Sequence, residues 1–149
     1  MIMEICAAIV GTISFSLLFG VPRKYYPWCG LIGGAGWAVY SVTVKHLGAA
    51  GASFAATMVV IFLSRAVAVG MRCPATIFLI SGIFPLVPGA GIYWTVYYLV
   101  TEQFLLAAST GYAAVKVAVA IVLGIVFVFE LPQSVFNVWA GFYREDLDN

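Results

Sequence analysis

Long apolar runs, separated by short breaks of charged residues and prolines, make up most of the chain. A hydrocarbon core of about 30 Å is crossed by roughly 17–25 apolar residues in a helix, so charges and prolines mark the natural ends of such helices. Division at these points predicts five transmembrane helices. Their expected ranges are 2–19, 28–44, 51–69, 75–100 and 105–129. We therefore predict an all-α integral membrane protein, with a transmembrane domain over residues 1–130 and a tail over 131–149.

Positive charges in the breaks predict the orientation of the chain. Lys and Arg in short loops prefer the cytoplasmic side of a membrane. If the N-terminus lies outside, the cytoplasmic ends hold Arg23, Lys24, Arg72 and Arg144, and an outer loop holds Lys45. The sequence therefore predicts an N-terminus outside and a C-terminus inside.

The tail after residue 131 has apolar positions on one helical stripe. These positions are Val135, Phe136, Val138, Trp139, Phe142 and Tyr143. Such a stripe is typical of a segment that lies in the membrane interface, but a flexible tail with a Trp anchor is an equal alternative.

Composition excludes several classes of protein. Of the 149 residues, 64% are hydrophobic and 9% are charged, against roughly a quarter charged in soluble domains. A soluble domain of this size leaves about a third of its surface in water, so lipid must surround part of this chain. A net charge of +1 without a basic cluster excludes a nucleic-acid surface. Three scattered cysteines and one histidine predict neither a disulfide nor a metal site.

The sequence also lacks the residues of an enzyme active site. No carboxylate lies in a predicted membrane core, and no phosphate loop of the G-x-x-x-x-G-K type is present. The glycine run at 30–36 is not a dinucleotide fingerprint, because the strand–turn–helix context is missing. We expect no catalytic residue and no cofactor, so transport would be driven by a gradient or by a partner.

The predicted second helix is rich in glycine. Gly30, Gly33, Gly34 and Gly36 lie in it, and Gly30 and Gly34 have the small-xxx-small spacing. Glycines at this spacing let two helix backbones approach closely, so we interpret the set as a packing surface. The neighbouring helix could belong to this chain or to another subunit.

The predicted fourth helix carries Pro85, Pro88, Gly89 and Gly91 near its middle. Each proline removes a backbone donor and crowds the carbonyl four residues earlier, so the helix should break or kink here. Transporters use such breaks, because a half-helix N-terminus presents free N–H groups and partial positive charge to an anionic substrate. A half-helix that starts near Gly89 is our candidate carboxylate site, with Tyr93 as a hydrogen-bond donor. A kink that only shapes packing is the alternative.

Two cations lie inside apolar runs, where a central charge costs about 2.5–3.5 kcal/mol. Arg65 is about a turn from a predicted cytoplasmic end, so it is interpreted as a membrane-edge or structural charge. Lys116 has two interpretations. Counted from Leu105 it lies mid-membrane and could attract an anionic substrate, whereas counted from Tyr112 it lies one turn inside and could reach water.

Several segments resemble the threonine/serine exporter family. They are Phe19-Gly20-Val21-Pro22-Arg23, the Trp-Cys-Gly-Leu-Ile-Gly-Gly-x-Gly run at 28–36, Ser64-Arg65, and the Phe-Leu-Ile-Ser-Gly-Ile-Phe-Pro-Leu-Val-Pro-Gly run at 78–89. The resemblance extends over nearly the whole chain up to the fifth predicted helix. It is to the small-subunit type, which is equivalent to the C-terminal membrane half of single-chain exporters.

This resemblance implies a two-component exporter in the cytoplasmic (inner) membrane of a prokaryote. The partner would be a large membrane subunit that carries a soluble domain. The implied substrates are threonine and serine, and succinate for some two-component members. Five helices would invert the second half relative to the first and create an inverted repeat.

Two other functions are compatible with the residues. The chain could be a membrane assembly subunit that does not transport, with the proline break acting only in packing. It could also form a homo-oligomeric channel, which would give flux from the single purified protein without a saturable site.

Overall fold

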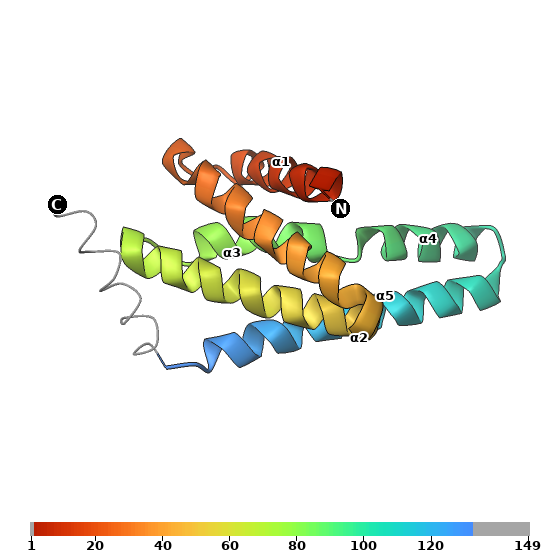
Figure 1. The fold of residues 1–149 in the computed structure, drawn as a ribbon. Coiled ribbons are helices and arrows are strands. Elements are labelled where there is room, and N and C mark those ends of the chain that lie inside the picture. Colours follow the sequence, from red (N-terminus) through yellow and green to blue (C-terminus); the bar gives the residue numbers. More distant parts are fainter. Residues whose placement is uncertain (1, 133–149) are drawn as a thin grey trace, which may run out of the picture.

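The structure is a computed structural model that describes residues 2–132, and its elements there are all helices (Figure 1). The elements are α1 (Ile2–Leu18), η1 (Arg23–Tyr25), α2 (Tyr26–Met71), α3 (Thr76–Ile83), η2 (Phe84–Leu86), α4 (Gly89–Val100) and α5 (Phe104–Phe129). The all-α prediction is confirmed for this part of the chain. The apolar stripe predicted in the tail, at 135–143, lies outside the described residues.

The long helix α2 folds back on itself at Gly48. The backbone there has φ 68° and ψ 177°, a region that only glycine adopts readily. Its two arms, residues 26–47 and 49–71, run back along each other (Figure 1), and a Cβ placed on Gly36 would touch Val60. These arms correspond to the predicted second and third helices. The first arm continues past the predicted end at 44, because Lys45 and His46 are exposed and exposed charged residues do not stop a helix.

Three helices end with one shared hydrogen-bond pattern. Gly20 (φ 68°) follows α1, Arg72 (51°) follows α2 and Glu102 (60°) follows α4. In each case the N–H group of this residue donates to the carbonyl three residues earlier, and the N–H group of the next residue donates to the carbonyl five residues before it. This is the Schellman motif, which stops a helix by a left-handed residue. It explains why the predicted breaks near these positions are real ends of helices.

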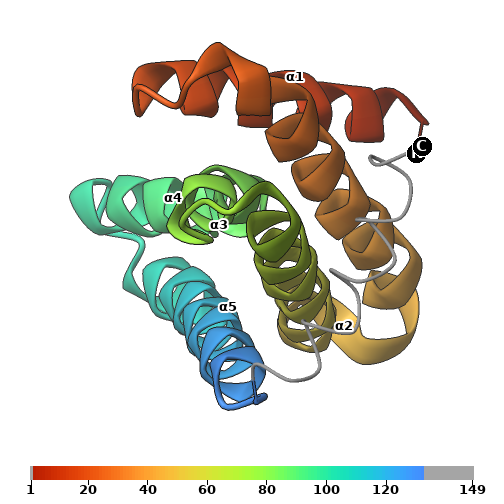
Figure 2. The ribbon, with the colours of Figure 1, turned by 90° about the vertical axis from the view of Figure 1, so that its left-hand side faces the viewer.

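The helices pack around α2, which contacts α1, α3 and α5. Figure 2 looks along the bundle and shows α1 on one side of α2 and α5 on the other. The turn after α1, the turn after α2 and the end of α5 all lie toward one end of the bundle in Figure 1. The two turns carry Arg23, Lys24 and Arg72, so three of the four basic residues expected on the cytoplasmic side gather at one end; the fourth, Arg144, lies outside the described residues.

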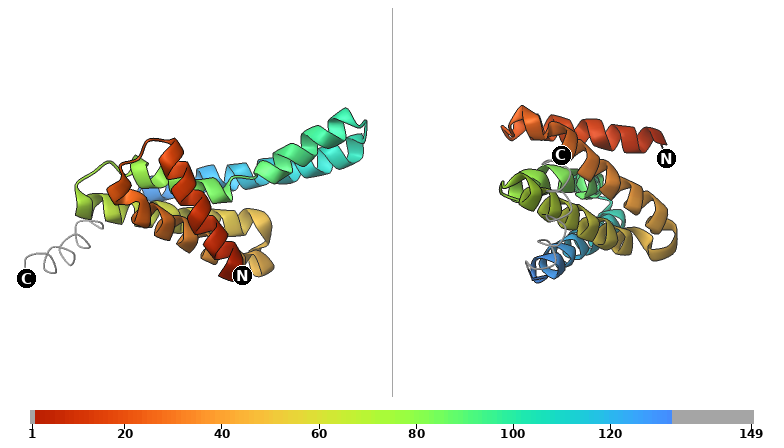
Figure 3. Two further views of the ribbon diagram at one scale, coloured as in Figure 1. Left: turned by 90° about the horizontal axis from the view of Figure 1, so that it is seen from above. Right: turned by 60° about the vertical axis from the view of Figure 1, so that its left-hand side comes forward.

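Helix α4 extends beyond the rest of the bundle together with the first half of α5 (Figure 3). It has no buried residue, and its main contacts are with α5. All other sides of α4 are therefore open.

Two helical segments of the described chain are long and apolar enough to cross a membrane, 23–71 and α5. The bent pair α3–α4 makes a third if it is one span, and α1 is an apolar helix of 17 residues. The structure thus supports a membrane protein with two or three such helices. A count of five requires that the two arms of α2 cross separately and that α1 crosses too.

Candidate substrate site

The helix that contains Pro85 and Pro88 is interrupted between α3 and α4, which meet at an angle of 49°. Residues 84–86 form a single 3₁₀ turn, and Val87 is extended. Neither proline can donate a backbone hydrogen bond, so the turn closes through Val87 N–H to the Phe84 carbonyl at 3.2 Å. Helix α4 then starts afresh at Gly89.

One side of the break is held by the bundle. Leu86 is buried in the main core, next to the first arm of α2 at Gly36. The Phe84 ring stacks on Phe15 of α1, with 3.9 Å between the ring centroids. Apolar packing on two helices therefore fixes the position at which α4 begins.

The other side of the break is open. Val87 and Gly89 are exposed, and a methyl group placed on Gly89 would meet no atom within 4 Å. Tyr93, one turn along α4, is also exposed. The N-terminus of α4, with its partial positive charge, therefore starts at an uncovered surface. The Gly89 N–H donates to the Val87 carbonyl at 2.7 Å, which leaves the N–H groups of Ala90 and Gly91 for a ligand.

Gly91 has a different environment from Gly89. A Cβ on Gly91 would lie 3.2 Å from the Ala114 side chain of α5. One turn later the Thr95 hydroxyl donates to the Gly91 carbonyl at 2.6 Å and lies 3.2 Å from the Thr110 hydroxyl. The structure thus gives Gly91 a role in packing α4 against α5.

Lys116 lies in the middle of α5, because this helix begins at Phe104. Its ammonium is 4.7 Å from the centre of the Tyr112 ring, and the side chain is exposed. Ala114 faces α4, and Lys116, two residues later, lies about 200° further round the axis of α5. Within this chain, Lys116 therefore points away from α4, and the structure does not bring it to Gly89.

Arg65 contacts protein at the end of α5. Its Nη1 donates to the carbonyls of Val128 at 2.6 Å and Leu131 at 3.2 Å, and its guanidinium lies 5.5 Å from the centre of the Phe129 ring. The last carbonyls of a helix carry partial negative charge and lack helical partners. Arg65 is thus a structural charge that caps α5, rather than a side chain that extends to water.

The glycines of the first arm of α2 meet neighbours within the same chain. Gly30, Gly33 and Gly34 face α1, and Gly36 faces the second arm. A Cβ on Gly33 would overlap the side chain of Thr12. Close backbone approach is therefore possible only with glycine at this crossing.

Sequence reasoning missed a set of buried hydroxyl groups between α1, α2 and α3. Thr12, Ser16 and Ser81 are fully buried, and the buried Cys29 thiol of α2 donates to the Ile77 carbonyl of α3 at 4.0 Å, the same carbonyl that accepts from the Ser81 hydroxyl. A signal was present, because Ala8, Thr12 and Ser16 form a small-residue stripe on α1. This set joins three helices and takes no part in the open site.

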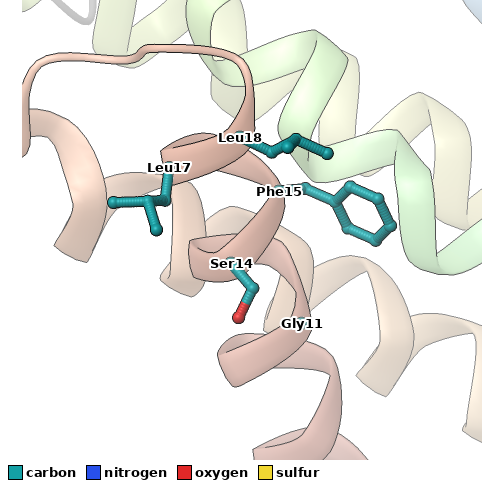
Figure 4. A pocket seen from close by; sticks show the side chains of 5 residues that line it. All are labelled: Gly11, Ser14, Phe15, Leu17 and Leu18. Atoms are coloured by element: carbon teal, nitrogen blue, oxygen red, sulfur yellow. The ribbon is translucent and has the colours of Figure 1, made fainter.

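A shallow hollow of about 500 Å³ lies on α1 (Figure 4). Phe15 and Leu18 lie on one side of it, Leu17 on the other, and Gly11 and Ser14 between them. The lining is apolar apart from one hydroxyl, which donates to the Val10 carbonyl. The hollow offers no charged group to a carboxylate, so the break at α4 is the better candidate site.

A broken apolar helix, held on one side and open on the other, is typical of membrane transporters. A profile described as "Threonine/Serine exporter, ThrE" matches residues 4–130, which include nearly all the described helices. The chain therefore belongs to the threonine/serine exporter family, whose members are transporters and not enzymes. No curated protein and no solved structure matches the chain significantly.

Proposed function

We propose that this chain is the small subunit of a two-component secondary exporter in the cytoplasmic membrane of a prokaryote. Its partner is a large membrane subunit with a soluble domain, and its cargo is a small carboxylate-bearing metabolite such as threonine, serine or succinate. The observation that carries this proposal is α4, which starts at a proline break and has no buried residue. A helix that is open on most sides in the single chain is expected to face a second membrane half.

The proposed half-site consists of the break at Pro85 and Pro88 and the first turn of α4. The N–H groups of Ala90 and Gly91 would bind the substrate carboxylate, because a helix N-terminus attracts anions. Tyr93 lies four residues after Gly89 and would add a hydrogen bond from the same side of the helix. Movement of this half against the partner half would expose the site to each side in turn.

The proposed topology has five membrane crossings, namely α1, the two arms of α2, the α3–α4 pair and α5. The gathering of Arg23, Lys24 and Arg72 at one end of the bundle supports a cytoplasmic position for that end. An odd number of crossings would place the two halves of the exporter in opposite orientations, as in an inverted repeat.

Efflux of labelled threonine, serine and succinate tests the proposal. Cells would express this chain alone, the large subunit alone, or both. Saturable efflux only with both subunits is the expected result and would identify the cargo. Non-saturable flux with this chain alone would instead establish a channel, and efflux with the large subunit alone would make this chain an assembly subunit.

A further inference from the structure

Three aromatic rings join α1 to the break before α4. Phe84, the first residue of η2, stacks on Phe15 of α1, with 3.9 Å between the ring centroids and 27° between the ring planes. The Phe19 ring, one turn further along α1, lies 5.5 Å from Phe84 and 6.3 Å from Phe15. Figure 4 shows the Phe15 ring on the side of α1 that faces the green ribbon of α3. We name these three residues the aromatic clasp.

Helix α1 is held on the first arm of α2 by a different set of contacts. Thr12 and Ile13 lie against the positions of Gly33 and Gly30. Phe15 comes two residues after Ile13 and therefore lies about 200° further round the axis of α1. A change of the Phe15 side chain thus leaves the crossing between α1 and the first arm in place, and alters mainly what α1 contributes to the break.

The first turn of α4 depends on the segment that precedes it. Packing of α4 on α5 begins at Gly91, where an added Cβ would lie 3.2 Å from Ala114. An added Cβ on Gly89 would meet no atom within 4 Å. The packed residues before that point are Leu86, in the core, and Phe84, in the aromatic clasp. The direction of the first N–H groups of α4 is therefore set by η2 and its two anchors.

We propose that Phe15 is a positioning residue for the substrate site, acting through Phe84. This inference rests on the proposed function, because it requires that the first turn of α4 binds the substrate carboxylate. Without the Phe15 ring, η2 would adopt other orientations, and only a fraction of the molecules would hold the first-turn N–H groups in the binding geometry. The apparent affinity for substrate falls by that fraction, whereas saturating substrate restores the binding geometry and with it the maximal rate.

Efflux kinetics test this split between KM and maximal rate. Both subunits are placed in liposomes, and the probe is labelled threonine, serine or succinate, whichever the wild-type pair exports. Phe15→Leu keeps an apolar side chain but removes the ring. Its KM is expected to rise about twofold to tenfold, the factor that corresponds to one aromatic pair, with a maximal rate per protein within about twofold of wild type. Phe15→Tyr keeps the ring and is expected to keep the wild-type KM.

Phe54→Leu is the matched control. The Phe54 ring of α2 pairs with Phe127 of α5 at 6.5 Å between centroids, so this variant also removes one ring from an aromatic contact between helices. The contact does not include η2, and the KM is expected to stay at the wild-type value. A rise in KM equal to that of Phe15→Leu would overturn the inference, because KM would then respond to any lost aromatic contact.

A double-mutant cycle tests whether Phe15 acts through Phe84. Phe84→Leu removes the ring that both aromatic residues of α1 contact, and it is expected to raise KM at least as much as Phe15→Leu. Residues that act through one contact have non-additive effects. The double variant Phe15→Leu/Phe84→Leu is therefore expected to have the KM of Phe84→Leu alone. A KM raised by the product of the two single factors would overturn the inference.

Two other results have separate meanings. A Phe15→Leu protein with an unchanged KM and a lower yield would show that the stack contributes only to packing, which overturns the inference. If the wild-type subunits together give no saturable efflux, the proposed function itself fails. If they do give it, and both Phe15→Leu and Phe84→Leu keep the wild-type KM, only the inference fails.

Discussion

Single side chains decide how closely α1 can approach the first arm of α2. Gly33 leaves the space that the Thr12 side chain occupies, and Thr12 is fully buried there. Small residues at such crossings stabilise membrane helices through close van der Waals packing, because lipid provides no hydrophobic drive for helices to associate. The contact is therefore sensitive to a single added side chain.

Gly33→Leu is expected to lower the free energy of unfolding by about 1–3 kcal/mol or more, since it overpacks a buried crossing. Thermal unfolding of the purified protein in detergent measures the effect. Gly11→Leu is the matched control, because it adds the same side chain to α1 where a Cβ meets no atom within 4 Å. Equal Tm values for the two variants would contradict the packing described for Gly33.

Left-handed residues at helix ends are a second feature at this scale. Glu102 ends α4 at φ 60°, in the position that Gly20 occupies after α1. A left-handed conformation costs a non-glycine residue roughly 1–2 kcal/mol, so the turn between α4 and α5 carries strain that the turn after α1 lacks. Gly20→Ala would introduce the same strain.

At the scale of the element, the break at Gly48 separates α2 into its two arms. The backbone conformation at Gly48 is open to glycine almost alone. Without this break, α2 would be one helix of 46 residues, and its second arm could not return along the first.

Gly48→Ala is expected to destabilise the protein by about 1–3 kcal/mol, the usual cost of a side chain in a sparsely populated backbone region. Gly11→Ala, in a regular helix, is expected to stabilise it by about 0.5–1 kcal/mol. Urea or thermal unfolding of the two variants checks the opposite signs. A stable Gly48→Ala protein would mean that the arms are joined in another way.

The end of α5 depends on a residue from another element. Arg65 of the second arm donates to carbonyls at 128 and 131, so the two helices are joined by charge as well as by packing. Arg65→Met is expected to cost about 1.5–3 kcal/mol, the usual contribution of hydrogen bonds to a charged group. Lys45→Met, at an exposed site, is the control for loss of a cation, and both are compared by Tm in detergent.

At the scale of the whole molecule, the proposed transport function depends on the open start of α4. Gly89→Leu is expected to leave expression and Tm unchanged, since no atom lies within 4 Å of an added Cβ. It is expected to lower efflux at least about tenfold, because the new side chain covers the N–H groups proposed to bind the carboxylate. The control is Val87→Leu, an exposed residue just before the helix. Full efflux from Gly89→Leu at matched protein levels would favour the assembly role.

The fold could be predicted from the sequence where a residue acts locally. Prolines at 85 and 88 interrupt a helix in any surroundings, so the break before α4 was predictable. Both ends of α1 and α5 and the C-terminal end of α4 were predictable to within about two residues. Prolines, charges or glycine lie at or next to these ends. The exact end of the first arm was not, since Lys45 and His46 are compatible with a helix in water.

The apolar runs, their breaks and the family motifs follow from the sequence alone, because the membrane requires long uncharged helices of any spanning segment. Only the tertiary structure decided which faces of these helices meet: Gly91 against α5, Arg65 on the end of α5, and Lys116 on the outer side. The physical reason is that lipid and protein interior are almost equally apolar. A membrane helix therefore lacks the polar face that reveals the orientation of a helix in a soluble protein, and its contacts depend on shape, which appears only when the helices are packed.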